Sequence, residues 1–311
     1  MNHRLENEKV SSLLFSLALP SILAQLATLI YNMVDRIYIG RLPDGGLSIA
    51  GIGLCTSIIT IITAFSNLFG RGGAPLASIK LGEKNPKEAE RILGNAFSSL
   101  ILTSLIIMFC LFVWGDKILI LFGASQKTLP YALSYLRIYA VGTVFIQLTV
   151  GLNYFINTQG YAKFGMMTLL IGGILNIILD PILIYTFKMG VLGAAVATLI
   201  ANVTMFFLFL YKGRSILFFD KTIGIEYEKV VEIMKLGFPM SFQRILFTFV
   251  NIILARMIAI FGSDALAVQK ISLQIESVTY MVIGGLNGAV ASFTGQNFGA
   301  KKYERIHEGY A

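Results

Sequence analysis

Two aspartates, Asp35 and Asp180, lie inside apolar stretches long enough to cross a bilayer. A carboxylate at membrane depth costs roughly 2.5–3.5 kcal/mol in membrane-insertion measurements, so such residues usually line a protein interior or a water-filled cavity. Asp35 ends a polar stripe that also contains Thr28 and Asn32 on one helix face. Asp180 follows Asn176 by one helical turn and shares its face. These residues predict the wall of a pathway for an ion or a polar substrate.

The elements that hold these residues are expected to be membrane helices. Hydrophobic residues make up 56% of the chain and charged residues 14%, which differs strongly from soluble domains. Apolar runs of about twenty residues recur along the whole length, so we predict an all-α polytopic membrane protein with about eight transmembrane helices. The expected spans are 13–39, 47–70, 92–114, 131–157, 165–187, 191–211, 230–261 and 265–294.

The basic residues predict how these spans are oriented. Lys and Arg gather in alternate loops, as in the loop that contains Lys80, Lys84 and Lys87. By the positive-inside rule, the N-terminus and the richer loops face the cytoplasm. The net charge of +8 forms no basic stripe with interleaved stacking aromatics, so we expect no nucleic-acid partner.

The sequence carries no constellation typical of an enzyme. His3 and His307 lie near the termini, and no CxxC spacing joins Cys55 to Cys110. Gly70-Arg71-Gly72-Gly73 is rich in glycine but lacks the Lys-Ser/Thr of a phosphate-binding loop. No nucleophile–base pair is evident, so we expect a non-enzymatic protein without an organic cofactor.

An internal repeat relates two parts of the chain at an offset of about 217–219 residues. It aligns Pro20 with Pro239, and Leu81-Gly82-Glu83-Lys84 with Phe298-Gly299-Ala300-Lys301. Many secondary transporters build a central cavity between two lobes from repeats of this size.

The repeat predicts two domains of unequal completeness. Residues 1–214 form a six-helix N-terminal lobe, and residues 215–311 form the first two helices of a second lobe. The second lobe is expected to be truncated at Ala311, as a premature stop or a fragment would produce. A dimer or a separate chain that completes this lobe is one expected kind of partner.

Four segments in order along the chain resemble the multidrug and toxin extrusion (MATE) family of antiporters. They are Tyr31-Asn32-Met33-Val34-Asp35-Arg36-Ile37-Tyr38-Ile39-Gly40, Asn176-Ile177-Ile178-Leu179-Asp180-Pro181, Gly193-Ala194-Ala195-Val196-Ala197-Thr198 and Gly295-Gln296-Asn297-Phe298-Gly299-Ala300. The resemblance runs from about Leu13 to Ala311. It implies a two-lobe, twelve-helix antiporter of the plasma (inner) membrane, here C-terminally truncated. Such antiporters export small amphiphilic, often cationic, compounds in exchange for Na⁺ or H⁺.

The resemblance also implies an acidic ion-coupling site in the first lobe. The family's coupling residues fall on Asp35, Asn176, Asp180 and Thr198, and its first-helix hinge proline falls on Pro20. Carboxylate, amide and hydroxyl oxygens are ligand types that a hard cation such as Na⁺ accepts.

A physical argument supports the coupling role, and an alternative remains. Two carboxylates that face one low-dielectric cavity repel each other, and a shared proton or a bound Na⁺ relieves the repulsion. The alternative is that Asp35 pairs with Arg36 or Arg41 while Asp180 caps its helix before Pro181.

Aromatic and amide residues are candidates for the wall of a promiscuous substrate cavity. They are Tyr31, Asn32, Tyr139, Gln147, Asn153 and Asn157. The alternative for the polar residues of the fourth span is interhelical hydrogen bonding, which contributes about 0.6 kcal/mol for each bond.

Two rival functions are a flippase for lipid-linked oligosaccharides and an inactive remnant of a transporter. A flippase cavity would carry several cations for pyrophosphate, whereas the polar residues around Asp35 and Asp180 are acidic. A remnant would follow from truncation, because antiport needs two lobes that rock about the site.

Overall fold

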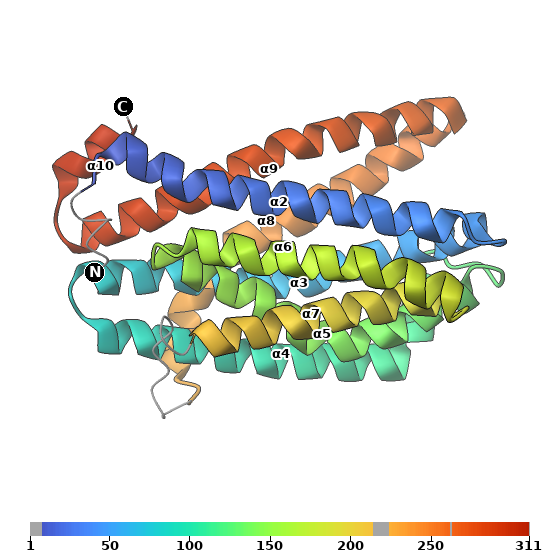
Figure 1. Ribbon diagram of the computed structural model, residues 1–311, viewed down its shortest axis with the longest axis horizontal. Coiled ribbons are helices and arrows are strands. Elements are labelled where there is room, and N and C mark those ends of the chain that lie inside the picture. Colours follow the sequence, from blue (N-terminus) through green and yellow to red (C-terminus); the bar gives the residue numbers. More distant parts are fainter. Residues whose placement is uncertain (1–7, 214–223, 262, 311) are drawn as a thin grey trace.

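The protein is all-α. The computed structural model describes residues 8–213, 224–261 and 263–310, in which the regular elements are α-helices and one short π-helix. The elements in chain order are α2 (Val10–Gly40), α3 (Gly45–Gly82), α4 (Pro86–Leu121), α5 (Leu129–Thr158), α6 (Ala162–Pro181), η1 (Ile182–Thr186), α7 (Val191–Gly213), α8 (Tyr227–Ala259), α9 (Ser263–Gly299) and α10 (Tyr303–Tyr310). The long helices run roughly along the longest axis of the molecule (Figure 1).

Six of the described helices are long and apolar enough to cross a membrane. They are α2, α3, α4, α5, α6 continued by η1, and α7, which correspond to the first six predicted spans. α8 and α9 contain 33 and 37 residues, more than the roughly 20 that a bilayer needs, but they are less apolar. The all-α prediction is confirmed, while the total of about eight crossings stays a prediction.

α3 and α5 pack closely in the middle of the bundle. A Cβ atom on Gly70 of α3 would collide with the Tyr154 ring of α5 and lie within 3.0 Å of the Gly151 backbone, so the missing side chain lets the two helices approach. Ile62 of α3 and Leu136 of α5 are almost fully buried in one shared apolar cluster. These two helices share the most extensive packing in the bundle.

The ends of α3 and α9 cross at two glycines that the internal repeat aligned. A Cβ atom on Gly82 would collide with the carbonyl oxygen of Gln296, and one on Gly299 would collide with the carbonyl oxygen of Ile79. The offset that relates Gly82 to Gly299 also relates Ile79 to Gln296. The crossing is therefore reciprocal, as a local two-fold axis would make it.

The residues that follow this crossing repeat the same backbone turn. Lys84 and Lys301 are both left-handed, with φ of 59° and 58°. The amides of Lys84 and Lys301 donate to the carbonyl oxygens of Leu81 and Phe298, respectively, which are the matching positions of the repeat. The sequence repeat is thus also a repeat of backbone geometry.

α8 and α9 contact α3 and α2 over only part of their length. The Ser241 hydroxyl of α8 donates to the carbonyl oxygen of Ala64 in α3 at 3.0 Å. A Cβ atom on Gly285 of α9 would collide with Ile22 of α2. Toward the α8–α9 connection, these two helices diverge from α2 and α3 (Figure 1). The N-terminal half of α2 therefore contacts α9, and its C-terminal half contains Asp35.

Candidate functional site

Asn176 and Asp180 of α6 form a hydrogen-bonded group with Thr198 of α7. The Asn176 side-chain amide Nδ2 donates to Asp180 Oδ1 at 3.4 Å and to Thr198 Oγ1 at 3.3 Å. Asp180 and Asn176 are fully buried, with 0% and 2% of their surface exposed. The spacing of one turn on α6 and the packing of α7 against it bring carboxylate, amide and hydroxyl together.

Asp35 of α2 approaches this group from a third helix. It is buried, and it interacts electrostatically with Asp180. Tyr31, one turn earlier on α2, lies over Gly173 of α6, where an added Cβ would come within 3.1 Å of the tyrosine ring. The small residue at position 173 therefore lets the acidic face of α2 approach α6.

Three oxygen atoms of this site have no hydrogen-bond partner although they are buried. They are Asp35 Oδ1, Asn176 Oδ1 and Asp180 Oδ2. Among the described residues, neither aspartate has a basic side chain within ion-pair distance. Asp35 therefore forms no ion pair with Arg36 or Arg41, although Arg36 interacts with it electrostatically at longer range. Buried acceptors without donors are costly, and a bound cation or proton would satisfy them.

The chemistry of this donor set fits a hard cation or a proton better than a transition metal. All three atoms without partners are oxygens, which Na⁺ accepts as ligands. The described residues contain no cluster of three His, Cys, Asp or Glu side chains that could hold a metal ion. The acidic site thus combines two carboxylates with one amide oxygen and one hydroxyl.

The aromatic candidates lie near the acidic site. Tyr139 of α5 is buried and stacks on Tyr135, with ring centroids 5.9 Å apart. Tyr31 interacts electrostatically with Tyr139, and Asp35 does so with Tyr135. Sequence reasoning missed Tyr135, although its position one turn before Tyr139 on the same helix was a usable signal.

Of the amide candidates, Asn32 lies next to Tyr31 and bonds to its side chain, and the other three make contacts elsewhere in the bundle. Asn32 is exposed and donates to the carbonyl oxygen of Thr28 in its own helix at 2.7 Å. Gln147 is fully buried, accepts a hydrogen bond from Thr103 of α4 and donates to the carbonyl oxygen of Ile62 in α3. These contacts of Gln147 are interhelical, which matches the alternative interpretation of its side chain.

Asn153 and Asn157 of α5 join α5 to α6. Asn157 Nδ2 donates to Asn153 Oδ1 at 2.8 Å, and Asn153 Nδ2 donates to the carbonyl oxygen of Gly165 at 3.5 Å. Only the bond from Asn153 to Gly165 joins two helices, and the bond between the two asparagines lies within α5, several turns from Tyr139. Whether they also contact a substrate stays a prediction.

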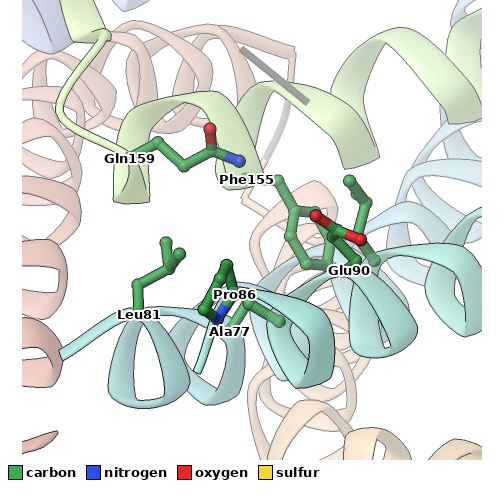
Figure 2. A pocket seen from close by; sticks show the side chains of 8 residues that line it. Ala77, Leu81, Pro86, Glu90, Phe155 and Gln159 are labelled. Carbon is green, nitrogen blue, oxygen red and sulfur yellow. The ribbon is translucent and has the colours of Figure 1, made fainter. Parts of the chain in front are cut away.

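A separate shallow pocket lies where α3, α4 and α5 meet. It is lined by Ala77, Leu81, Pro86, Ala89, Glu90, Leu93, Phe155 and Gln159 (Figure 2). None of the predicted site residues contributes to its lining. The pocket is therefore distinct from the acidic site.

The comparisons with known proteins agree on one family. The MatE family model matches residues 20–182 and 239–310. The multidrug export protein MepA of Staphylococcus aureus (strain N315) is 29% identical over 301 residues, covering 96% of this chain and 66% of that protein. MepA of Staphylococcus saprophyticus is 30% identical over 305 residues, with the same coverage. The chain thus spans 66% of the length of these curated relatives.

Solved structures show the same fold. A multidrug resistance MATE family transporter in an outward-facing conformation superposes with a TM-score of 0.89 at 24% identity, covering 99% of this chain and 69% of that one. A chain named "protein A" superposes with a TM-score of 0.91 at 30% identity, covering 99% of this chain and 70% of that chain. The chain is therefore a multi-pass membrane protein that belongs to the MATE family.

Proposed function

We propose that this protein exports small amphiphilic or cationic drugs or toxins in exchange for Na⁺ or H⁺. The observation that carries the proposal is a pair of buried aspartates, Asp35 and Asp180. Neither Asp35 Oδ1 nor Asp180 Oδ2 has a hydrogen-bond donor. The relatives named multidrug export proteins support the substrate class. No cofactor beyond the coupling ion is needed.

The proposed coupling site consists of Asp35, Asn176, Asp180 and Thr198. When both carboxylates are ionised, their repulsion in a poorly solvated site is strong, because little solvent screens it. A proton shared by the pair or a Na⁺ held by its oxygens removes this repulsion. Ion entry from outside and drug exit would then alternate, since the site cannot stabilise both positive charges at once.

Pro20 is the proposed hinge through which ion binding acts on the rest of the protein. It lies inside α2, which continues through it as a helix, and it cannot donate to the carbonyl oxygen of Ser16. Asp35 follows Pro20 on the same helix, while Ile22 contacts α9. Neutralising Asp35 would change how one half of α2 packs on α6, and the weakened backbone at Pro20 lets that half bend.

The proposed location is the plasma membrane, with the N-terminus in the cytoplasm. Basic residues that follow α3 and α9, such as Lys84 and Lys301, gather at the end where these helices cross. The positive-inside rule assigns this end to the cytoplasm.

The test is ethidium efflux from cells that lack their own drug pumps and express this chain. The unaltered chain should lower intracellular ethidium, and Asp35→Asn and Asp180→Asn should each reduce the efflux rate at least about tenfold, because each removes a charge that the ion compensates. Proteoliposomes with either a Na⁺ or a H⁺ gradient would then identify the coupling ion.

A matched control is Asp116→Asn, which neutralises an exposed acid of α4. Its efflux rate should stay within about twofold of the unaltered chain. An unaltered chain without efflux, or equal loss in all three variants, would contradict the proposed function.

A further inference from the structure

Opposite charges join α4 to the start of α8 at the end of the molecule where α3 and α9 cross. Arg91 of α4 donates from Nε and Nη2 to the two carboxylate oxygens of Glu226, each at 3.2 Å. Lys229 of α8 forms an ion pair with Glu88 of α4. Because α4 begins only a few residues after α3 ends, both pairs lie beside the crossing. The proposed coupling site uses none of these residues.

The backbone that leads into α8 is bound at the same place. The Glu226 amide donates to Asn95 Oδ1 at 2.6 Å, and Asn95 Nδ2 donates to the carbonyl oxygen of Arg91 at 2.9 Å. Asn95 is buried, and it lies one turn after Arg91 on α4. Glu226 is therefore held through its side chain by Arg91 and through its backbone by Asn95, which fixes the start of α8 against α4.

The internal repeat places a related contact on the other side of the crossing. An offset of 217 residues relates Glu88 of α4 to Arg305 of α10. Arg305 Nη2 donates to the carbonyl oxygen of Glu8, which comes shortly before α2, at 2.8 Å. α10 thus contacts the start of α2, as α4 contacts the start of α8. The two contacts differ in chemistry, because α10 binds a backbone carbonyl whereas α4 and α8 pair full charges.

These contacts hold one end of the molecule together, whereas the helices separate toward the other end. Beside the ion pairs, Ser78 Oγ of α3 donates to the carbonyl oxygen of Ser292 in α9 at 3.1 Å. Gln296 Nε2 of α9 donates to the carbonyl oxygen of Thr158 in α5 at 2.7 Å. At the opposite end, α8 and α9 diverge from α2 and α3 (Figure 1). A transporter that exposes its site to each side in turn must separate these helices at the crossing in another step.

The exposure of the ion pairs makes them easy to release. The side chains of Arg91 and Glu226 are 52% and 44% exposed, and those of Lys229 and Glu88 are 23% and 18% exposed. Water solvates such charges after they separate, so each pair holds the helices only weakly. Dissolved salt weakens the pairs further, because it screens exposed charges.

We propose that Glu88, Arg91, Glu226 and Lys229 form a releasable latch, which keeps α4 and α8 together at the crossing end until the protein opens there. This inference rests on the proposed export function and supplies a conformational control for it. Loss of the latch charges shifts the protein toward the state that is open at the crossing end, and high salt does the same.

The test measures opening as the rate at which a buried cysteine reacts with N-ethylmaleimide in the purified full chain. Ser78→Cys places this cysteine in the contact between α3 and α9, and Cys110 is replaced by alanine. Glu88→Gln should raise the labelling rate about threefold, and Glu88→Gln with Arg91→Gln about tenfold, as expected from losing one and then both ion pairs. Adding Lys229→Gln to Glu88→Gln should change nothing further, because their pair is already lost.

Salt provides a test that needs no substitution in the latch. Raising KCl from about 20 mM to about 500 mM should accelerate labelling of Ser78→Cys about threefold, since it screens the exposed pairs. In the Glu88→Gln/Arg91→Gln variant, the rate should be the same at both salt concentrations, because the remaining Arg305 contact pairs a charge with a neutral carbonyl. A salt-independent labelling rate with the latch intact would overturn the proposal.

Two controls separate release of the latch from unfolding. Glu83→Gln removes the ion pair of Glu83 with Lys80, which lies at the same end within α3, and should leave the rate within about 1.5-fold. Cys55 is fully buried among the first six helices and should stay unlabelled in every variant, which mass spectrometry of the peptides would show. A rate for Glu88→Gln/Arg91→Gln no higher than that for Glu83→Gln would overturn the latch.

The latch and the export function fail in different ways, because labelling needs no drug. Ethidium efflux together with a labelling rate that does not depend on the latch charges would contradict the latch alone. A labelling rate that depends on these charges, in a chain without efflux, would contradict the export function and support the latch.

Discussion

At the scale of single residues, the Asn176 amide organises the acidic site. Its one NH₂ group serves both Asp180 and Thr198, which lie on different helices. Because both bonds use Nδ2, the carbonyl oxygen Oδ1 is left without a donor and is buried. The amide thus turns its donor toward the carboxylate and leaves its acceptor available for the ion of the proposed coupling site.

The Thr198 hydroxyl is expected to support ion coupling through this amide. Thr198→Val keeps the shape of the side chain but removes the acceptor for Asn176 Nδ2, so the amide is free to rotate away from its present orientation. We expect about a tenfold higher Na⁺ or H⁺ concentration for half-maximal ethidium efflux. Thr198→Ser, which retains the hydroxyl, is the matched control and should stay within about threefold. Equal ion concentrations for half-maximal efflux in Thr198→Val and Thr198→Ser would contradict a role for the hydroxyl.

The residue types at this site could be predicted from sequence, but several of their neighbours could not. Helical spacing shows that Asn176 and Asp180 share a face. It does not show which helix lies against that face, and this is why Gln147 was a candidate for the cavity wall. The structure places Gln147 between Thr103 and Ile62, inside the bundle. Such a contact depends on tertiary packing between residues far apart in the chain.

At the scale of the helices, α2 contacts two separate parts of the protein with its two halves. Tyr31 and Asp35 face α6, whereas Ile22 contacts Gly285 of α9. Pro20 lies close to the second contact and well before the first. A bend there would move the acidic face relative to α9 while leaving α6 and α7 in place.

Pro20→Ala should therefore reduce export without unfolding the protein. The substitution restores a backbone donor and raises helix propensity by about 3 kcal/mol, which stiffens α2 at the proposed hinge. We expect the ethidium efflux rate to fall at least about fivefold, while the midpoint of thermal unfolding in detergent stays the same or rises.

Pro75→Ala is the control for this experiment, because Pro75 also lies inside a long helix, α3, away from Asp35. Pro75→Ala raises helix propensity by the same amount, but its efflux rate should stay within about twofold of that of the unaltered chain. A Pro20→Ala protein that exports at the normal rate would rule out the hinge.

At the scale of the whole molecule, ion pairs join α8 to the first six helices. From the sequence, the basic residues of these pairs were used only to predict which loops face the cytoplasm. Arg91 of α4 forms hydrogen bonds to both carboxylate oxygens of Glu226 at 3.2 Å, and Lys229 of α8 pairs with Glu88. Positive-inside counting identifies the loops that carry these cations. It does not predict that acids separated by more than a hundred residues neutralise some of them. The Arg91–Glu226 pair is exposed and contributes about 0–1 kcal/mol, so it positions α8 more than it stabilises it, whereas Lys229 and Glu88 are partly buried.

The reciprocal crossing of α3 and α9 leads to a prediction about the sidedness of the whole protein. Because α3 and α9 cross at Gly82 and Gly299, the loops that follow them must lie on one side of the membrane, whereas the α4–α5 loop lies at the opposite end of α4.

Labelling of single cysteines introduced at exposed positions tells which side of the membrane each loop faces. Cys110 is replaced by alanine for this experiment, and the buried Cys55 is retained. An impermeant maleimide should label Lys127→Cys in intact cells, but Lys87→Cys and Glu304→Cys only after permeabilisation. The reverse pattern would overturn the cytoplasmic N-terminus, and opposite labelling of Lys87→Cys and Glu304→Cys would contradict the shared side itself.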